Sequence, residues 1–178
     1  MVSARPAMVS ARPAMVSARP AGPGRRQGGA GGRGCAPPML GEWEVPEMQS
    51  LSVRTLAHSQ LQDITGDIQA TVEASGWRDG VLTVFVPHTT AGVTINENAD
   101  PDVAADLLRA LDAAVPWQAG YRHAEGNAAA HVKASMMGSS AQVVVEGGRL
   151  RLGVWQSVYF CEFDGPRSRS VWLAFAGR

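Results

Sequence analysis

The sequence predicts an α+β fold with mainly antiparallel β-sheets and two to three helices. Helical patterns interleave with strand patterns before residue 138, and strand patterns fill most of the chain after it. Two of the late strand patterns flank Gly147-Gly148, a turn typical of a hairpin and therefore of antiparallel pairing. A length of 178 residues, 45% of them hydrophobic, is typical of one domain with a tail.

Residues 1–47 differ from the rest of the chain and are expected to form a disordered, low-complexity tail. The heptapeptide MVSARPA occurs three times in residues 1–21, and a segment rich in Gly, Pro and Arg follows. Proline in every repeat disfavours a helix, and two adjacent apolar residues cannot form a coiled-coil seam. A start codon assigned too far upstream, with Met39 or Met48 as the true start, is the preferred explanation. A basic tether or a targeting peptide is the alternative, and residues 48–178 are expected to be a single domain.

The first half of the domain is expected to alternate strands with helices. The expected order is strand 52–57, a short helix from Asp63 or Thr65 to Gly76, strand 81–86 and strand 93–96. The helix prediction rests on apolar residues four positions apart, Ile64, Ile68 and Val72, which share one helix face. The strand predictions rest on short apolar or alternating runs, and the apolar run over 81–86 is bounded by Gly80 and Pro87.

Two further helices are expected before the late strands. Asp100 is placed to cap the first of them, because Pro101 favours a helix start and Pro116 ends the pattern. Residues 127–137 have helical propensity and end at Gly138. The late strands are expected over 142–146, 149–154, 157–162 and 170–176.

Aromatic residues of the late strands are expected in the core or at an interface. They are Trp155, Tyr159, Phe160 and Trp172. Cys161 lies among them without a basic neighbour that would lower its pKa, so we interpret it as a small buried hydrophobe and not as a nucleophile.

Charge and cysteine content argue against several classes of protein. The 16 Lys and Arg residues balance the 16 Asp and Glu residues, which gives no sign of a general nucleic-acid binder. No stretch approaches the ~20 apolar residues of a membrane span. Two distant cysteines do not make a disulfide framework. We expect a cytoplasmic protein without a nucleic-acid or membrane partner.

Histidines and hydroxyl residues gather where the apolar patterns end. His88 follows a buried strand, and Thr89 and Thr90 come directly after it. His123 and His131 lie in a second polar segment. Three protein ligands with an open position are the arrangement of a catalytic zinc, so His88, His123 and His131 are the predicted metal ligands. Core-edge histidines are the competing interpretation.

Other polar residues indicate phosphate and Mg²⁺ chemistry. Glu97 is the candidate carboxylate, because Asp100 is explained by helix capping. Lys133 and Arg167 carry positive charge suited to phosphate, and Ser139 offers a hydroxyl. A solvated strand entrance is the alternative for Arg167. We therefore expect a small phosphorylated metabolite as ligand and a divalent metal, Mg²⁺ or Zn²⁺, as cofactor.

Four strings taken together closely resemble the YjbQ family, once an uncharacterised family and now commonly labelled secondary thiamine-phosphate synthase. They are PHTTAGVTINENADPDV (87–103), YRHAEGNAAAHVKASMMGSS (121–140), GRLRLGVWQSVYFCEFDGPR (148–167) and the closing strand. The resemblance covers about 48–178. It implies a YjbQ-like, trimer-forming α+β fold with antiparallel sheets, a homotrimer as the functional assembly, and a weak thiamine-phosphate synthase activity.

The resemblance also adds weight to particular site residues. The family's polar signature maps onto His88, Thr89, Thr90, Asn96, Glu97, Asn98, His123, Glu125, Asn127, His131, Lys133, Gly138 and Ser139. With the residue chemistry above, we predict His88, Glu97 and Lys133 as catalytic, and Thr89, Thr90, Asn96, Asn127, Ser139 and Arg167 as substrate-binding. Relatives often carry Asp where this chain has Ala129, so His131 is expected to lack a carboxylate partner here.

The implied reaction joins hydroxymethylpyrimidine diphosphate to hydroxyethylthiazole phosphate and releases pyrophosphate. Two alternatives stay open. One is a metal-dependent hydrolase in which the three histidines activate water. The other is a non-catalytic trimer that holds a phosphorylated metabolite. A stoichiometric transition metal would favour the hydrolase, and turnover of the two substrates would separate the transferase from the binding protein.

Overall fold

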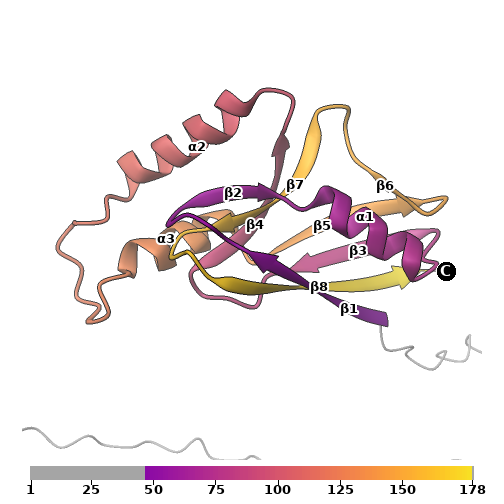
Figure 1. Ribbon diagram of the computed structural model, residues 1–178, viewed down its shortest axis with the longest axis horizontal. Coiled ribbons are helices and arrows are strands. Elements are labelled where there is room, and N and C mark those ends of the chain that lie inside the picture. The colour runs from indigo at the N-terminus through magenta and orange to yellow at the C-terminus, as the bar shows by residue number, and fades with distance from the viewer. Residues whose placement is uncertain (1–46, 178) are drawn as a thin grey trace, which may run out of the picture. The chain divides into compact units, whose positions relative to one another are not determined.

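A computed structural model of the chain describes residues 47–177 (Figure 1). The expected tail lies outside these residues except for Glu47, which begins the first strand. The strands are β1 (Glu47–Arg54), β2 (Gln60–Asp63), β3 (Gly80–Phe85), β4 (Ala91–Glu97), β5 (Ser140–Glu146), β6 (Arg149–Arg151), β7 (Gln156–Glu162) and β8 (Ser168–Gly177). The helices are α1 (Thr65–Ala74), α2 (Pro101–Ala114) and α3 (Ala128–Met137). Across residues 47–177, none of the helices has the length and apolar character that a membrane crossing requires.

The strands form two antiparallel sheets, which confirms the predicted α+β class. One sheet has the order β1-β8-β3-β5-β6, and the other has the order β2-β7-β4. The main core lies between them, because residues of both sheets and the apolar face of α1 belong to one buried cluster. A second cluster lies on the other face of the three-stranded sheet, under α2 and α3. In Figure 1 these two helices lie at the left of the view and α1 at the right.

β7 is the strand that both cores share. Val158 and Phe160 point into the core between the sheets, and Tyr159 and Cys161 point toward α2 and α3. Strand alternation sends successive side chains to opposite faces, so a central strand covered on both faces reads as one apolar run. Cys161 is fully buried, which confirms its prediction as a small buried side chain, and burial raises its pKa to about 12.

The helix starts agree with the local sequence signals. α1 begins at Thr65, whose N–H donates to Asp63 Oδ1 at 2.8 Å. α2 begins at Pro101, and the carboxylate of Asp100 accepts the N–H of Asp102 at 2.9 Å. These contacts satisfy backbone donors of the first turn that have no partner within the helix.

Two strand predictions were wrong in their bounds, and one strand was not predicted. β1 occupies Glu47–Arg54 and not 52–57. The pattern over 149–154 ends at Arg151, because the chain then turns toward β7. β2 was not predicted, since QLQD shows no apolar alternation, and it forms by pairing with β7 between Gln60↔Glu162 and Asp63↔Tyr159.

Candidate functional site

His88 closes the hydrogen-bond ladder where β3 leaves β8. Phe85 pairs with Trp172, so continued pairing would bring Pro87 opposite Ser170. The chain departs from the sheet at that point, and the Nε2 atom of His88 accepts the N–H of Ser170 at 2.9 Å. The His88 side chain thus accepts the hydrogen bond that a strand carbonyl would otherwise accept, and its imidazole is held just beyond the end of β3.

His88 borders a groove of about 480 Å³ between the start of β4 and the second half of α3. The residues that line it are His88, Thr89, Ala91, His131, Ala134, Ser135, Gly138 and Ser139. The two walls meet closely, since a Cβ atom on Gly92 would lie 2.7 Å from the carbonyl oxygen of Gly138. Of the described residues that line this groove, none is acidic. Imidazoles and hydroxyls therefore set its hydrogen-bonding character.

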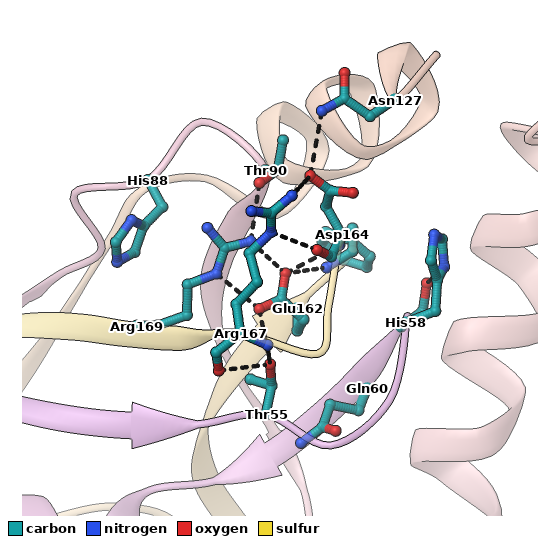
Figure 2. A network of polar contacts seen from close by, with 12 residues as sticks. Thr55, His58, Gln60, His88, Thr90, Asn127, Glu162, Asp164, Arg167 and Arg169 are labelled. Atoms are coloured by element: carbon teal, nitrogen blue, oxygen red, sulfur yellow. Dashed lines mark hydrogen bonds and ion pairs between the residues drawn. The ribbon is translucent and has the colours of Figure 1, made fainter. Parts of the chain in front are cut away.

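A buried ion pair lies beside His88 and joins the two sheets (Figure 2). Arg169 of β8 donates from Nε to Glu162 Oε2 at 2.7 Å and from a terminal nitrogen to Glu162 Oε1 at 2.5 Å. The same guanidinium donates to Thr90 Oγ1 at 2.9 Å. Thr55 donates to Glu162 Oε2 at 3.1 Å, and the N–H of Asp164 donates to Oε1 at 2.9 Å. Glu162 is 0% exposed and Arg169 8% exposed, so this network is part of the interior.

This network affects the protonation of two groups. Burial acts to raise the pKa of Glu162, but the hydrogen bonds and charge of Arg169, with the N–H of Asp164 and the Thr55 hydroxyl, hold that pKa below its ordinary value. Burial, and then the positive charge of Arg169, lower the pKa of His88. His88 is therefore neutral at neutral pH, and Glu162 is ionised.

The structure brings the predicted metal ligands together only in part. His88 and His131 line the same groove. The rings of His131 and His123 meet edge to face, with 5.2 Å between their centroids, and His123 Nε2 lies 3.7 Å from the carboxylate of Glu125. Within residues 47–177, however, no group of three or more His, Cys, Asp or Glu side chains is arranged to hold a metal ion. In a single chain these residues do not form the expected three-histidine centre.

The other predicted site residues lie in three different places. Thr89 and Ser139 line the groove, and Thr90 belongs to the buried network. Asn127 and Arg167 both bond to Asp164, from Nδ2 at 3.2 Å and from a terminal nitrogen at 2.8 Å. The Oδ1 atom of Asn127 is buried without a partner among the described residues.

Glu97 and Lys133 lie away from the groove. Asn96 and Glu97 end β4, whereas His88 lies before its start, and the seven residues of β4 span roughly 20 Å. Near Glu97, the hydroxyl of Tyr159 donates to its carbonyl oxygen at 3.1 Å. Lys133 is 2% exposed and forms an ion pair with Asp112 of α2. It follows His131 by two helical positions, so the two side chains leave α3 on nearly opposite sides.

Residue chemistry alone missed the roles of Glu162 and Asp112. Glu162 lies within an otherwise apolar run, VYFCEF, and that position predicts a buried carboxylate in need of a partner. Arg169 is that partner. Lys133 shares the buried face of α3 with Ala130 and Ala134, a spacing that could have revealed a buried lysine.

Comparison with known proteins gives consistent matches over this domain. The family described as UPF0047 protein YjbQ-like matches residues 49–178. The UPF0047 protein YugU of Bacillus subtilis is 48% identical over 131 residues, which are 73% of this chain and 99% of that protein. A UPF0047 protein of Methanocaldococcus jannaschii is 42% identical, covering 70% of this chain and 91% of its own length.

Solved structures agree with the fold. A crystal structure of an uncharacterised YjbQ/UPF0047-family protein from Clostridium acetobutylicum has a TM-score of 0.70 and 52% identity, and covers 72% of this chain and 99% of that chain. A hypothetical protein from Aeropyrum pernix has a TM-score of 0.71 and 37% identity, with coverage of 74% and 99%.

Proposed function

The chain belongs to the YjbQ-like UPF0047 family, and from this premise we propose that its groove binds a small phosphorylated metabolite and that the protein is a weak thiamine-phosphate synthase. One observation carries the proposal: the groove beside His88 is lined by imidazoles and hydroxyls, and none of its described lining residues is acidic. Such a surface offers hydrogen-bond donors to phosphoryl oxygens without repelling their charge.

The proposed reaction makes modest demands on the protein. The thiazole nitrogen of hydroxyethylthiazole phosphate attacks the methylene carbon of hydroxymethylpyrimidine diphosphate, so a C–N bond forms. The C–O bond to the diphosphate breaks, and pyrophosphate leaves with the electron pair. The attacking nitrogen carries no proton, so a general base is not required. The protein has to hold two substrates in line and stabilise the leaving diphosphate, and His88, Thr89 and Ser139 supply donors for that task.

The proposal is tested by turnover of the two substrates with matched variants. We expect His88→Ala to lower thiamine-phosphate formation at least tenfold, and Ser139→Ala about three- to fivefold, the range for one lost hydrogen bond. Ser168→Ala removes an exposed serine that does not line this groove and is expected to leave the rate unchanged. Glu97→Gln and Lys133→Ala test the two predicted catalytic residues outside the groove. No turnover by the unmodified protein, together with no binding of pyrophosphate, would contradict the proposal.

A metal-dependent hydrolase is the second candidate, and the contact between His123 and His131 favours it. Two imidazoles with the Glu125 carboxylate nearby are borderline ligands of the kind that Zn²⁺ takes, whereas Mg²⁺ prefers oxygen ligands. Metal analysis of the purified protein decides this point. One equivalent of zinc that is lost in the His123→Ala variant would favour the hydrolase over the transferase.

We further propose that the protein acts as a homotrimer. The support is the outer face of the five-stranded sheet, where large apolar side chains are exposed. They are Met48, Val81, Phe85, Val144 and Trp172. Phe85 and Trp172 stack on that face with ring centroids 5.7 Å apart. Exposed apolar patches of this kind are typical of interaction surfaces. Light scattering should give the mass of a trimer, and a monomer at micromolar concentration would contradict this proposal.

A further inference from the structure

The hydrogen bond between Ser170 and His88 determines which ring nitrogen carries the proton. A backbone N–H can only donate, so the Nε2 atom that receives it at 2.9 Å must present a lone pair. A neutral imidazole has one protonated nitrogen, and that nitrogen is then Nδ1. A cationic imidazole is protonated on both nitrogens and could not accept this bond, so the ring is neutral. The free edge of this imidazole is therefore an N–H donor.

Three segments are tied together around that ring. Arg169 precedes Ser170 in β8, Glu162 ends β7, and Thr90 lies two residues after His88. The guanidinium of Arg169 bonds to both carboxylate oxygens of Glu162 and to the hydroxyl of Thr90. A planar guanidinium with two parallel bonds to a carboxylate has a fixed orientation. The pair thus holds the Ser170 backbone and the His88 loop in a fixed relation.

We propose that His88 is a tautomer-fixed hydrogen-bond donor, that its Nδ1–H binds a phosphoryl oxygen in the groove, and that Arg169 and Glu162 are the positioning residues that maintain this state. The identity of the ligand rests on the proposed function, whereas the tautomer rests on the geometry alone. A metal ion needs a free imidazole lone pair, and His88 has already given its lone pair to Ser170. His88 is consequently assigned to anion recognition and not to the predicted metal centre.

The tautomer is tested by NMR of the full-length protein labelled with ¹⁵N and ¹³C in histidine. The His88→Gln variant identifies the His88 signals among those of the four histidines. We expect the His88 signals of a single neutral tautomer protonated at Nδ1. They should stay unchanged on addition of one equivalent of Zn²⁺ and should shift on addition of inorganic pyrophosphate. A ring protonated at Nε2, or His88 signals displaced by stoichiometric Zn²⁺, would overturn the inference.

Matched variants test the positioning pair. Arg169→Lys and Glu162→Gln should each produce a mixture of His88 tautomers and weaken pyrophosphate binding about fivefold, as expected for one misdirected hydrogen bond. The exposed pair Arg151 and Glu146, joined at 3.1 Å, provides the control: Arg151→Lys and Glu146→Gln should change neither readout. Thr90→Val removes one bond of the network and serves if the buried variants fail to fold; it should give a smaller change of the same kind.

The outcomes separate the two levels of the proposal. A single Nδ1–H tautomer that persists in Arg169→Lys, Glu162→Gln and Thr90→Val would overturn the positioning role. A fixed Nδ1–H tautomer whose signals pyrophosphate does not move would overturn the phosphate ligand of His88, whereas turnover of the two substrates still decides the proposed function. A mixture of His88 tautomers in the unmodified protein would overturn the inference. Turnover of the two substrates would still decide the proposed function.

Discussion

Two ion pairs of this molecule join a buried residue to an oppositely charged partner, and they differ in how completely the pair is enclosed. Glu162 and Arg169 are both buried, and the carboxylate accepts hydrogen bonds from a guanidinium, a hydroxyl and two backbone N–H groups. Lys133 is equally buried, but its partner Asp112 has a side chain that is 62% exposed. The first pair joins the two sheets in the interior. The second joins α3 to α2, and its carboxylate is exposed to solvent. The comparison predicts different sensitivities to mutation, pH and salt.

Breaking the enclosed pair should have the largest effect. Glu162→Ala leaves Arg169 buried without its carboxylate, and removal of one member of a buried pair costs about 3–5 kcal/mol of unfolding free energy. Urea unfolding of the full-length protein measures this loss. The double variant Glu162→Leu/Arg169→Met should recover part of it, because no unpaired charge remains. A loss below about 1 kcal/mol in Glu162→Ala would contradict the view of this pair as an internal junction.

Breaking the half-open pair should cost less. Asp112→Asn removes the charge that faces Lys133, but the Asp112 carboxylate is exposed, so water already screens its interaction with the ammonium group. We expect a loss of about 1–2 kcal/mol, with Asp106→Asn on the same helix as the exposed control. High salt should reduce the difference in unfolding free energy between the unmodified protein and Asp112→Asn. It should leave the loss of unfolding free energy in Glu162→Ala unchanged. Equal losses for Glu162→Ala and Asp112→Asn would erase the distinction between the pairs.

The enclosed pair also predicts a pH dependence of stability. The folded-state pKa of Glu162 is lowered, so the folded protein binds fewer protons on this group than the unfolded chain does. The stabilisation is therefore complete above the ordinary pKa of 4.5 and is lost as the pH falls through the lower folded-state value. Glu162→Gln should be less stable at pH 7 but show a flatter decline below pH 4.5. If the unfolding free energies of the unmodified protein and Glu162→Gln declined in parallel below pH 4.5, the lowered pKa of Glu162 would be contradicted.

His88 sharpens the same comparison at higher pH. Its folded-state pKa is lowered from 6.5, so its contribution to stability is present above pH 6.5 and is lost as the pH falls below that value. His88→Gln keeps an acceptor within reach of the Ser170 N–H but does not titrate. Unfolding free energies of the two proteins should therefore converge between pH 7 and pH 5. A constant difference over this range would show that His88 does not titrate in the way the geometry implies.

The smallest effect is expected for the exposed pair of Arg151 and Glu146. Both side chains are more than half exposed, and such surface pairs contribute about 0–1 kcal/mol. Glu146→Gln should change the unfolding free energy by less than about 0.5 kcal/mol, measured in the same urea series. A larger change would mean that enclosure is not the property that separates these pairs.

Part of the site could be predicted because its residues occupy the ends of recognisable elements. The end of a buried strand at Pro87 marked His88, and the end of a helix at Gly138 marked Ser139. Both residues line the groove. Glu97 and Lys133 stand out equally in the sequence, yet they lie away from the groove. The sequence shows that they are close to His88 or His131 along the chain. It does not show which end of β4 or which face of α3 borders the groove.

Elements with local signals could be predicted from the amino-acid sequence. Asp100 and Pro101 start α2, Gly147 and Gly148 turn β5 into β6, and four-residue spacing sets the buried face of α1. Each of these signals acts over a few residues, through backbone conformation, capping or a shared face.

The remaining features depend on contacts between segments far apart in the chain. β2 is a strand because β7 pairs with it. Lys133 meets a carboxylate 21 positions away, and His88 meets a backbone N–H 82 positions away. The strand register fixes the contact between His88 and Ser170, and helix packing on the three-stranded sheet fixes the contact between Lys133 and Asp112. Both depend on the burial of apolar surface across the whole domain, which no short segment encodes.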